Sequence, residues 1–141
     1  MANIIPFAFR GELFSGTHNF SNGGNEFKIA LYTGNPYSTS STQYLTSQEV
    51  SGSNTGYTVK GKLLGAQAVA SGTAVASVDF GDSVLTSATF TAAFAAIYND
   101  TNADKLCVVL DFGGNKTATN GTFTIAFPNP STPGNAIISM A

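Results

Sequence analysis

Residues 121–127, Gly-Thr-Phe-Thr-Ile-Ala-Phe, decide the fold class of this chain. Their large apolar residues, Phe123, Ile125 and Phe127, alternate with threonine and alanine. A period of two places alternate side chains on opposite faces of a β-strand. We therefore expect a strand here, with one face in a core and the other face polar.

On both sides of this stretch, similar short segments recur, separated by turn-forming glycine and asparagine residues. This spacing favours many short strands. Residues 105–112 are almost continuously apolar, which predicts a central strand covered on both faces. The expected strands are Glu26–Thr33, Tyr57–Leu64, Ala74–Phe80, Phe94–Tyr98, Lys105–Phe112, Gly121–Phe127 and Ala136–Met140.

The segments between these strands predict turns and loops. Gly113-Gly114-Asn115 and Asn120-Gly121 can supply the positive φ angles of tight connections. Asp100–Asp104 joins two strong strands, and its side chains can bond their own backbone. Residues 38–42 form a polar loop, and residues 129–134, with two prolines, form an extended spacer.

One short element precedes the first strand. Ala8–Ser15 predicts a helix closed by Gly16 as its C′ residue, and an edge strand is the alternative. We expect residues 1–141 to form a single all-β domain, an antiparallel β-sandwich or jelly roll with at most one short helix. Residues 129–141 supply the spacer and the last strand.

Composition limits the function classes. Only 10% of the 141 residues are charged and the net charge is −2, so no basic stripe is present to bind nucleic acid. No segment approaches the roughly 18 apolar residues of a membrane span. The first residues lack the basic region of a secretory signal, which predicts synthesis and retention in the cytoplasm until assembly.

Catalytic chemistry has little support in the sequence. The one histidine, His18, stands in a turn-like polar stretch and predicts a surface side chain rather than a general base. The one cysteine, Cys107, lies in an apolar run and predicts a buried small residue rather than a reactive thiol. Residues 52–56 lack the central serine of a hydrolase elbow. We expect no catalytic residue, no metal site and no cofactor.

Two other groups of side chains allow alternatives. Asp79 and Asp82 flank a glycine, and Asp100–Asp104 has the spacing that begins a calcium loop, but Lys105 stands where that loop requires glycine. Ordinary turn acids are favoured over a weak cation site. The five tyrosines could offer stacking faces to glycans, although packed cross-strand pairs are favoured; they are Tyr32, Tyr37, Tyr44, Tyr57 and Tyr98.

A series of motifs resembles a family of small tailed-phage virion structural proteins. The motifs, in order, are Phe27–Thr33, Tyr44-Leu45-Thr46, Glu49-Val50-Ser51-Gly52, Gly56-Tyr57-Thr58, Val78–Asp82, Ala92–Asp100, Val109–Gly113 and Asn120–Ile125. The resemblance covers most of the chain, and it implies a virion component without a catalytic role. We interpret the protein as a capsid decoration, or cement, protein on the capsid surface. A tail-associated or fibre-base protein that contacts host glycans is the alternative.

The implied partners are the major capsid protein and further copies of this chain, with a homotrimer favoured by the three-fold positions of coat lattices. Residues 1–9 form a candidate arm, in which Ile4, Ile5, Phe7 and Phe9 would reach a neighbouring subunit. Pro6 keeps this stretch extended. The alternative is a first strand that packs on the body of the same chain.

Overall fold

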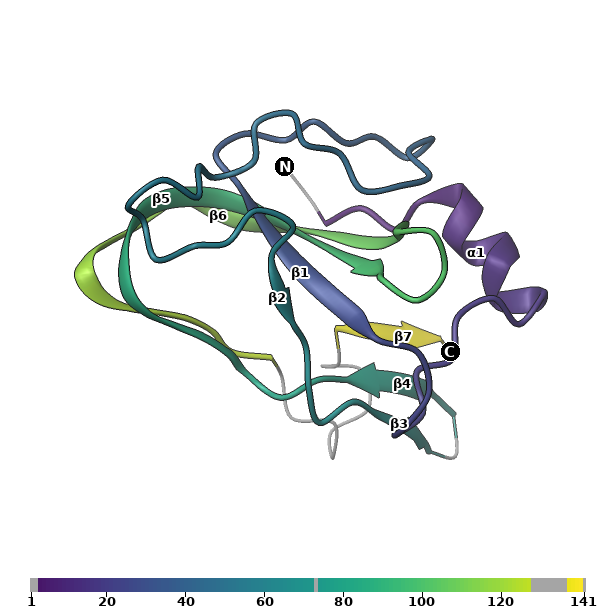
Figure 1. The fold of residues 1–141 in the computed structure, drawn as a ribbon. Coiled ribbons are helices and arrows are strands. Elements are labelled where there is room, and N and C mark those ends of the chain that lie inside the picture. The colour runs from purple at the N-terminus through teal and green to yellow at the C-terminus, as the bar shows by residue number, and fades with distance from the viewer. Residues whose placement is uncertain (1–2, 73, 128–136, 141) are drawn as a thin grey trace.

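The computed structural model describes residues 3–72, 74–127 and 137–140. In these residues the chain forms one helix and seven strands, arranged in two antiparallel sheets (Figure 1). The expected all-β, sandwich-like fold with one short helix is therefore confirmed.

The larger sheet has four strands in the order β2 (Lys62–Leu63), β1 (Phe27–Tyr32), β5 (Ser83–Asn99) and β6 (Lys105–Ile125). Five of the six residues of β1 are buried, as expected for a strand covered on both faces. β6 is likewise buried from Leu106 to Val109. The expectation that this segment is a central strand was wrong, because β6 ends the strand order. Among the described residues, its other side is paired only by two isolated bridges, Ile4 with Val109 and Gln43 with Lys105.

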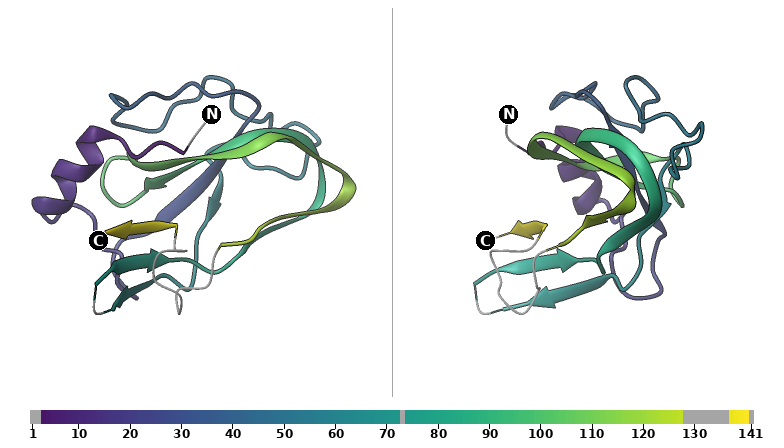
Figure 2. Two further views of the ribbon diagram at one scale, coloured as in Figure 1. Left: turned by 180° about the vertical axis from the view of Figure 1, so that it is seen from behind. Right: turned by 90° about the vertical axis from the view of Figure 1, so that its left-hand side faces the viewer.

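β5 and β6 form one long hairpin around the predicted turn at residues 100–104. The tight turns expected at Gly113–Asn115 and at Asn120-Gly121 were wrong, because both lie inside β6. Gly113 (φ 77°) and Asn120 (φ 45°) do adopt positive φ, but at irregularities in strand pairing. Between two paired positions, Ala93 alone faces the four residues 112–115. Such bulges bend a strand, and the hairpin curves from the larger sheet toward the smaller one (Figure 2).

The smaller sheet has the order β3 (Ala68–Ser71), β4 (Ala76–Asp79) and β7 (Ile138–Met140). β4 and β7 fall within expected strands, whereas β3 had not been expected. The expected spacer at residues 129–134 and the start of the last strand at residue 136 lie outside the described residues.

The strand expected at Tyr57–Leu64 is wrong except for its last part, β2. Lys60 (φ 78°) and Gly61 (φ 83°) take left-handed conformations that interrupt an extended chain. Gly61 also lies against β1, where an added Cβ would be 2.1 Å from the carbonyl oxygen of Ile29. The chain therefore makes a tight turn before it joins the sheet edge.

The predicted helix is confirmed as α1 (Phe7–Phe14). Ser15 is its C-cap, and Gly16 follows with φ 74°, the left-handed conformation typical of a C′ glycine. Pro6 precedes the helix as its N-cap. The edge-strand alternative for this segment does not occur.

Two apolar clusters cover opposite faces of the larger sheet. Phe27, Ile29 and Leu31 of β1 point into the larger cluster, which also contains Ile138 of the smaller sheet and Phe9 of α1. The alternate residues of β1, such as Tyr32, belong to a second cluster with Tyr37 from the long loop between β1 and β2. The period of two in β1 therefore places side chains in both the core between the two sheets and the cluster on which this loop packs.

Candidate functional site

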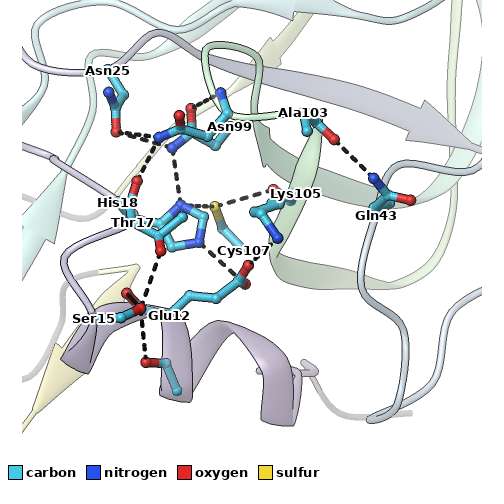
Figure 3. Close-up of polar contacts among 12 residues, drawn as sticks. Glu12, Ser15, Thr17, His18, Asn25, Gln43, Asn99, Ala103, Lys105 and Cys107 are labelled. Atoms are coloured by element: carbon cyan, nitrogen blue, oxygen red, sulfur yellow. Dashed lines mark hydrogen bonds and ion pairs between the residues drawn. The ribbon is translucent and has the colours of Figure 1, made fainter.

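Titratable side chains gather where α1 and the segment after it meet the turn between β5 and β6 (Figure 3). Glu12 comes from α1, His18 from the following segment, Asn99 from the end of β5, and Lys105 and Cys107 from the start of β6. We refer to these five residues as the His18 cluster. It joins parts of the chain that are more than 80 residues apart.

His18 is not the surface residue that the sequence predicted. Its side chain has no exposed surface, and its ring lies among aromatic rings, with centroid distances of 5.0 Å to Phe9, 6.2 Å to Phe20 and 6.5 Å to Phe27. The local sequence is polar and turn-like, but the docking of α1 turns the imidazole inward. Burial therefore comes from tertiary packing that the local composition does not reveal.

The hydrogen bonds of Asn99 determine the tautomer of His18. The Oδ1 atom of Asn99 accepts hydrogen bonds from the backbone N–H groups of Thr101 and Asn102, both at 3.1 Å. The Nδ2 group of Asn99 must therefore be the one that donates to Nδ1 of His18, at 3.0 Å. Nδ1 acts as the acceptor, so the ring proton is on Nε2, which donates to Oε1 of Glu12 at 3.4 Å.

This arrangement favours a neutral imidazole. Burial is the main effect on the pKa of His18 and lowers it, while the carboxylate of Glu12 opposes the decrease. The other oxygen of Glu12 forms an ion pair with Nζ of Lys105 at 2.8 Å, and Lys105 also lowers the pKa of His18. Protonation would place an N–H at Nδ1 directly against an N–H of the Asn99 amide, so the hydrogen bond between these two buried groups would be lost.

Cys107 is fully buried, which confirms its sequence interpretation. Its Sγ atom lies 3.8 Å from Nδ1 of His18 and 3.7 Å from the carbonyl oxygen of Lys105. The thiol of Cys107 thus contacts the imidazole of His18, which in turn contacts the carboxylate of Glu12, the same order of groups as in thiol enzymes. However, burial raises the pKa of the Cys107 thiol well above its usual value, and a substrate cannot reach a fully buried sulfur atom. The cluster is built to hold α1 and the hairpin together.

A second polar cluster surrounds Glu49 in the long loop between β1 and β2. One carboxylate oxygen of Glu49 accepts hydrogen bonds from the hydroxyl of Tyr57 at 2.6 Å and from the backbone N–H of Lys60 at 2.8 Å. The other oxygen accepts the hydroxyl of Tyr44. Burial and the hydrogen bond to Glu49 both raise the pKa of each of these tyrosines. We call these four residues the Glu49 cluster.

The remaining tyrosines attach the same loop to the sheet. The hydroxyl of Tyr32 contacts that of Tyr37 at 2.5 Å and donates to the carbonyl oxygen of Leu45 at 2.7 Å. The hydroxyl of Tyr98 donates to the carbonyl oxygen of Lys60. All five tyrosine hydroxyls are therefore hydrogen-bonded within the chain. Packed tyrosines were expected, but they anchor a loop instead of forming cross-strand pairs.

Three of the four turn acids have ordinary partners, whereas Oδ1 of Asp79 is buried without a hydrogen bond. Asp100 lies 3.5 Å from Nζ of Lys28, and Asp104 lies 2.9 Å from Nζ of Lys60. Asp82 accepts a hydrogen bond from the backbone N–H of Phe127 at 3.0 Å. Within the described part of the chain, no group of three or more histidine, cysteine or acidic side chains is arranged to hold a metal ion. Residues 52–56 lie in an irregular loop and not between a strand and a helix, as a hydrolase elbow would require.

The four residues of the candidate arm differ in their surroundings. The backbone of Ile4 exchanges two hydrogen bonds with Val109, both at 2.9 Å. Ile5 packs against the larger core cluster, and Phe9 is completely buried within it. Only Phe7, at 60% exposed, points away from the body. Three of these residues thus pack on the body of their own chain, but the alternative of a first strand is wrong beyond the bridge at Ile4, because Phe7 and Phe9 belong to α1.

Several grooves lie beside these clusters or away from them. One, about 660 Å³, runs along β6, and its apolar lining includes Leu110, Phe112, Phe123 and Phe127. None of its lining residues belongs to the His18 or Glu49 cluster. A second, about 380 Å³, includes His18 but is otherwise mostly apolar. A third, about 310 Å³, is lined by Tyr57 of the Glu49 cluster and by residues of β2 and β5. None of these grooves brings together the reactive groups that a catalytic site needs.

No family model, curated protein or solved structure matches this chain. Among the described residues, no helix is long and apolar enough to cross a membrane.

Proposed function

We propose that this protein is a non-enzymatic structural component of a tailed-phage particle, and that it binds the assembled coat lattice as a decoration protein. The observation that carries the proposal is the role of the motif residues in the fold. Glu49 and Tyr57, from two adjacent motifs of the resemblance, bond to each other, and Asp100 pairs with Lys28 of β1. These residues maintain a scaffold, as expected of a structural protein.

The two side chains best suited to catalysis are also used for packing. His18 is enclosed by aromatic rings, and its hydrogen bonds favour the neutral form. Cys107 is buried with a raised pKa, which opposes the thiolate that a nucleophile requires. Both residues support a structural role in preference to an enzymatic one.

A decoration protein stabilises a shell by binding only the assembled lattice, so its binding free energy adds to that of assembly. A weakly charged surface suits close contact with coat subunits and with further copies of the chain. Large apolar side chains are exposed on several elements and could supply such contacts: Phe7, Phe14, Val59, Leu63, Val69 and Met140. The tail-associated alternative with glycan contacts draws less support, because four of the five tyrosines are buried and cannot offer a ring face to a glycan.

Co-sedimentation with coat shells tests the proposal. Shells of the phage whose genome encodes this chain, assembled without it, would be mixed with the purified protein and pelleted. We expect saturable binding to shells and none to unassembled coat subunits. Equal binding to both, or no binding to shells, would show that the protein does not decorate the capsid.

A further inference from the structure

The helix α1 is apolar on two opposite sides. At 100° per residue, Phe9 and Leu13 lie on one side of the helix, and Phe7 and Phe14 lie within about 20° of each other on the other side. The first pair packs into or against the core, whereas Phe7 and Phe14 are 60% and 91% exposed. A helix that is apolar all round is normally buried all round.

The buried side of α1 is firmly attached. Phe9 is fully enclosed, and Glu12 holds both His18 and Lys105. The helix lies at one side of the molecule, beside rather than between the two sheets (Figure 1). The outer phenylalanines therefore cannot turn inward without breaking these contacts, and no segment among the described residues buries them.

The outer side of α1 has a pattern that fits a copy of itself. Phe7 and Phe14 are about 10 Å apart along the axis, at 1.5 Å per residue. Gly11 lies between them, and nothing occupies the space within 4 Å of an added Cβ there. Arg10 is drawn toward the start of the helix, since its guanidinium lies 5.3 Å from the Phe7 ring and donates to the carbonyl oxygen of Ile5 at 3.3 Å. The centre of this side is therefore open backbone between two aromatic rings.

We propose that α1 is a two-fold self-association surface, in which two helices cross antiparallel over Gly11. Two-fold symmetry makes the same patch meet itself. If one residue contacts a second residue of the other copy, the second residue of the first copy makes the same contact in return. Phe7 and Phe14 are equidistant from the middle of the helix, so Phe7 of one copy meets Phe14 of the other on both sides. Gly11 lets the two backbones approach closely, and Arg10 gains a second aromatic face from Phe14 of the other copy.

The contact is small. One eight-residue helix from each copy buries less than the roughly 1,200–2,000 Å² of a standard stable interface. We therefore expect a weak dimer that forms at micromolar or higher concentrations. A dimer differs from the trimer suggested by lattice symmetry, which did not rest on a surface of the chain. The inference stands apart from the proposed phage role, because it concerns the purified protein alone.

Pairwise cysteine cross-linking tests the geometry. Chains carrying Phe7→Cys and chains carrying Phe14→Cys, with different tags, would be mixed under mild oxidation; Cys107 is buried and does not interfere. We expect disulfides between the two kinds of chain. Disulfides formed mainly within one kind, Phe14→Cys to Phe14→Cys, would indicate a parallel or three-fold contact and would overturn the proposal.

Sedimentation of the full-length protein gives the second test. Gly11→Gln introduces a better helix former into open space, so the chain should stay folded while the close crossing is blocked. We expect this variant and Phe14→Ser to raise the dimer dissociation constant at least about tenfold, the effect of losing a central interface residue. Leu63→Ser, which removes an exposed apolar side chain elsewhere, should leave it unchanged. A wild-type chain that stays monomeric up to about 1 mM, or equal weakening by all three variants, would refute the two-fold contact.

Discussion

Acidification should weaken the fold through His18. The unfolded chain takes up a proton near pH 6.5, the ordinary pKa of histidine. The folded chain resists that proton to a lower pH, because burial lowers the pKa of His18 and Asn99 already donates to Nδ1. Between those two pKa values the unfolded state binds more protons, so the free energy of unfolding must fall as the pH falls.

The magnitude has a firm upper limit. One group changes the free energy of unfolding by at most about 1.4 kcal/mol per pH unit. Because His18 is the one histidine in the chain, no other imidazole contributes to this slope. The loss of stability that His18 causes is absent above about pH 6.5. It grows progressively below that pH, before most carboxylates titrate.

Denaturant unfolding at several pH values between 7 and 5 measures this slope. The control is His18→Gln, which cannot titrate; its free energy is subtracted from that of the wild type at each pH, so that shared carboxylate effects cancel. We expect the difference to fall toward acid. A difference that rises toward acid would mean that the ion pair with Glu12 dominates and that the imidazolium is the stable form, which would refute the tautomer derived from Asn99.

Three further changes test the fold and its loop anchors. Phe9→Ala should lower the free energy of unfolding by about 3–5 kcal/mol, because a fully buried aromatic side chain is lost; chemical denaturation that shows less than about 1 kcal/mol would mean that α1 is not docked. Gly61→Ala should cost at least about 1 kcal/mol, since φ is +83° and the new Cβ would meet Ile29, whereas Gly65→Ala, in open space, should be nearly neutral in the same assay. Glu49→Gln should cost about 1–3 kcal/mol and speed amide hydrogen exchange in the loop between β1 and β2, because charge-assisted hydrogen bonds are lost; unchanged exchange would show that this carboxylate does not hold the loop.

The pattern of apolar residues and glycines predicted those strand segments and the helix end that depend only on residues near one another in the sequence. The alternation at residues 121–127 and the apolar run at residues 105–112 both mark true strand, and Gly16 marks the true end of α1. The sequence did not reveal that these two segments belong to one strand. Positive φ at Gly113 and Asn120 serves equally well in a turn or in a bulge, and only the pairing with β5 distinguishes the two.

The candidate site was less accessible to sequence reasoning, because its members come together only in the folded chain. His18 stands in a polar stretch, and no local signal shows that Phe9, Phe20 and Phe27 enclose it. Phe14 could have been noticed, since it lies seven residues after Phe7 and thus on the same side of a helix. The expected arm was read as an extended segment, which concealed this spacing.

The most direct measurement of the central claim is the position of the protein in a phage particle. A peptide tag inserted in the exposed loop at residues 52–54 would be labelled with gold-conjugated antibody and imaged by electron microscopy on purified particles. The proposed decoration role predicts label distributed over the whole capsid surface. Label confined to the tail, or particles that carry no label while the tagged protein remains free in the lysate, would contradict it.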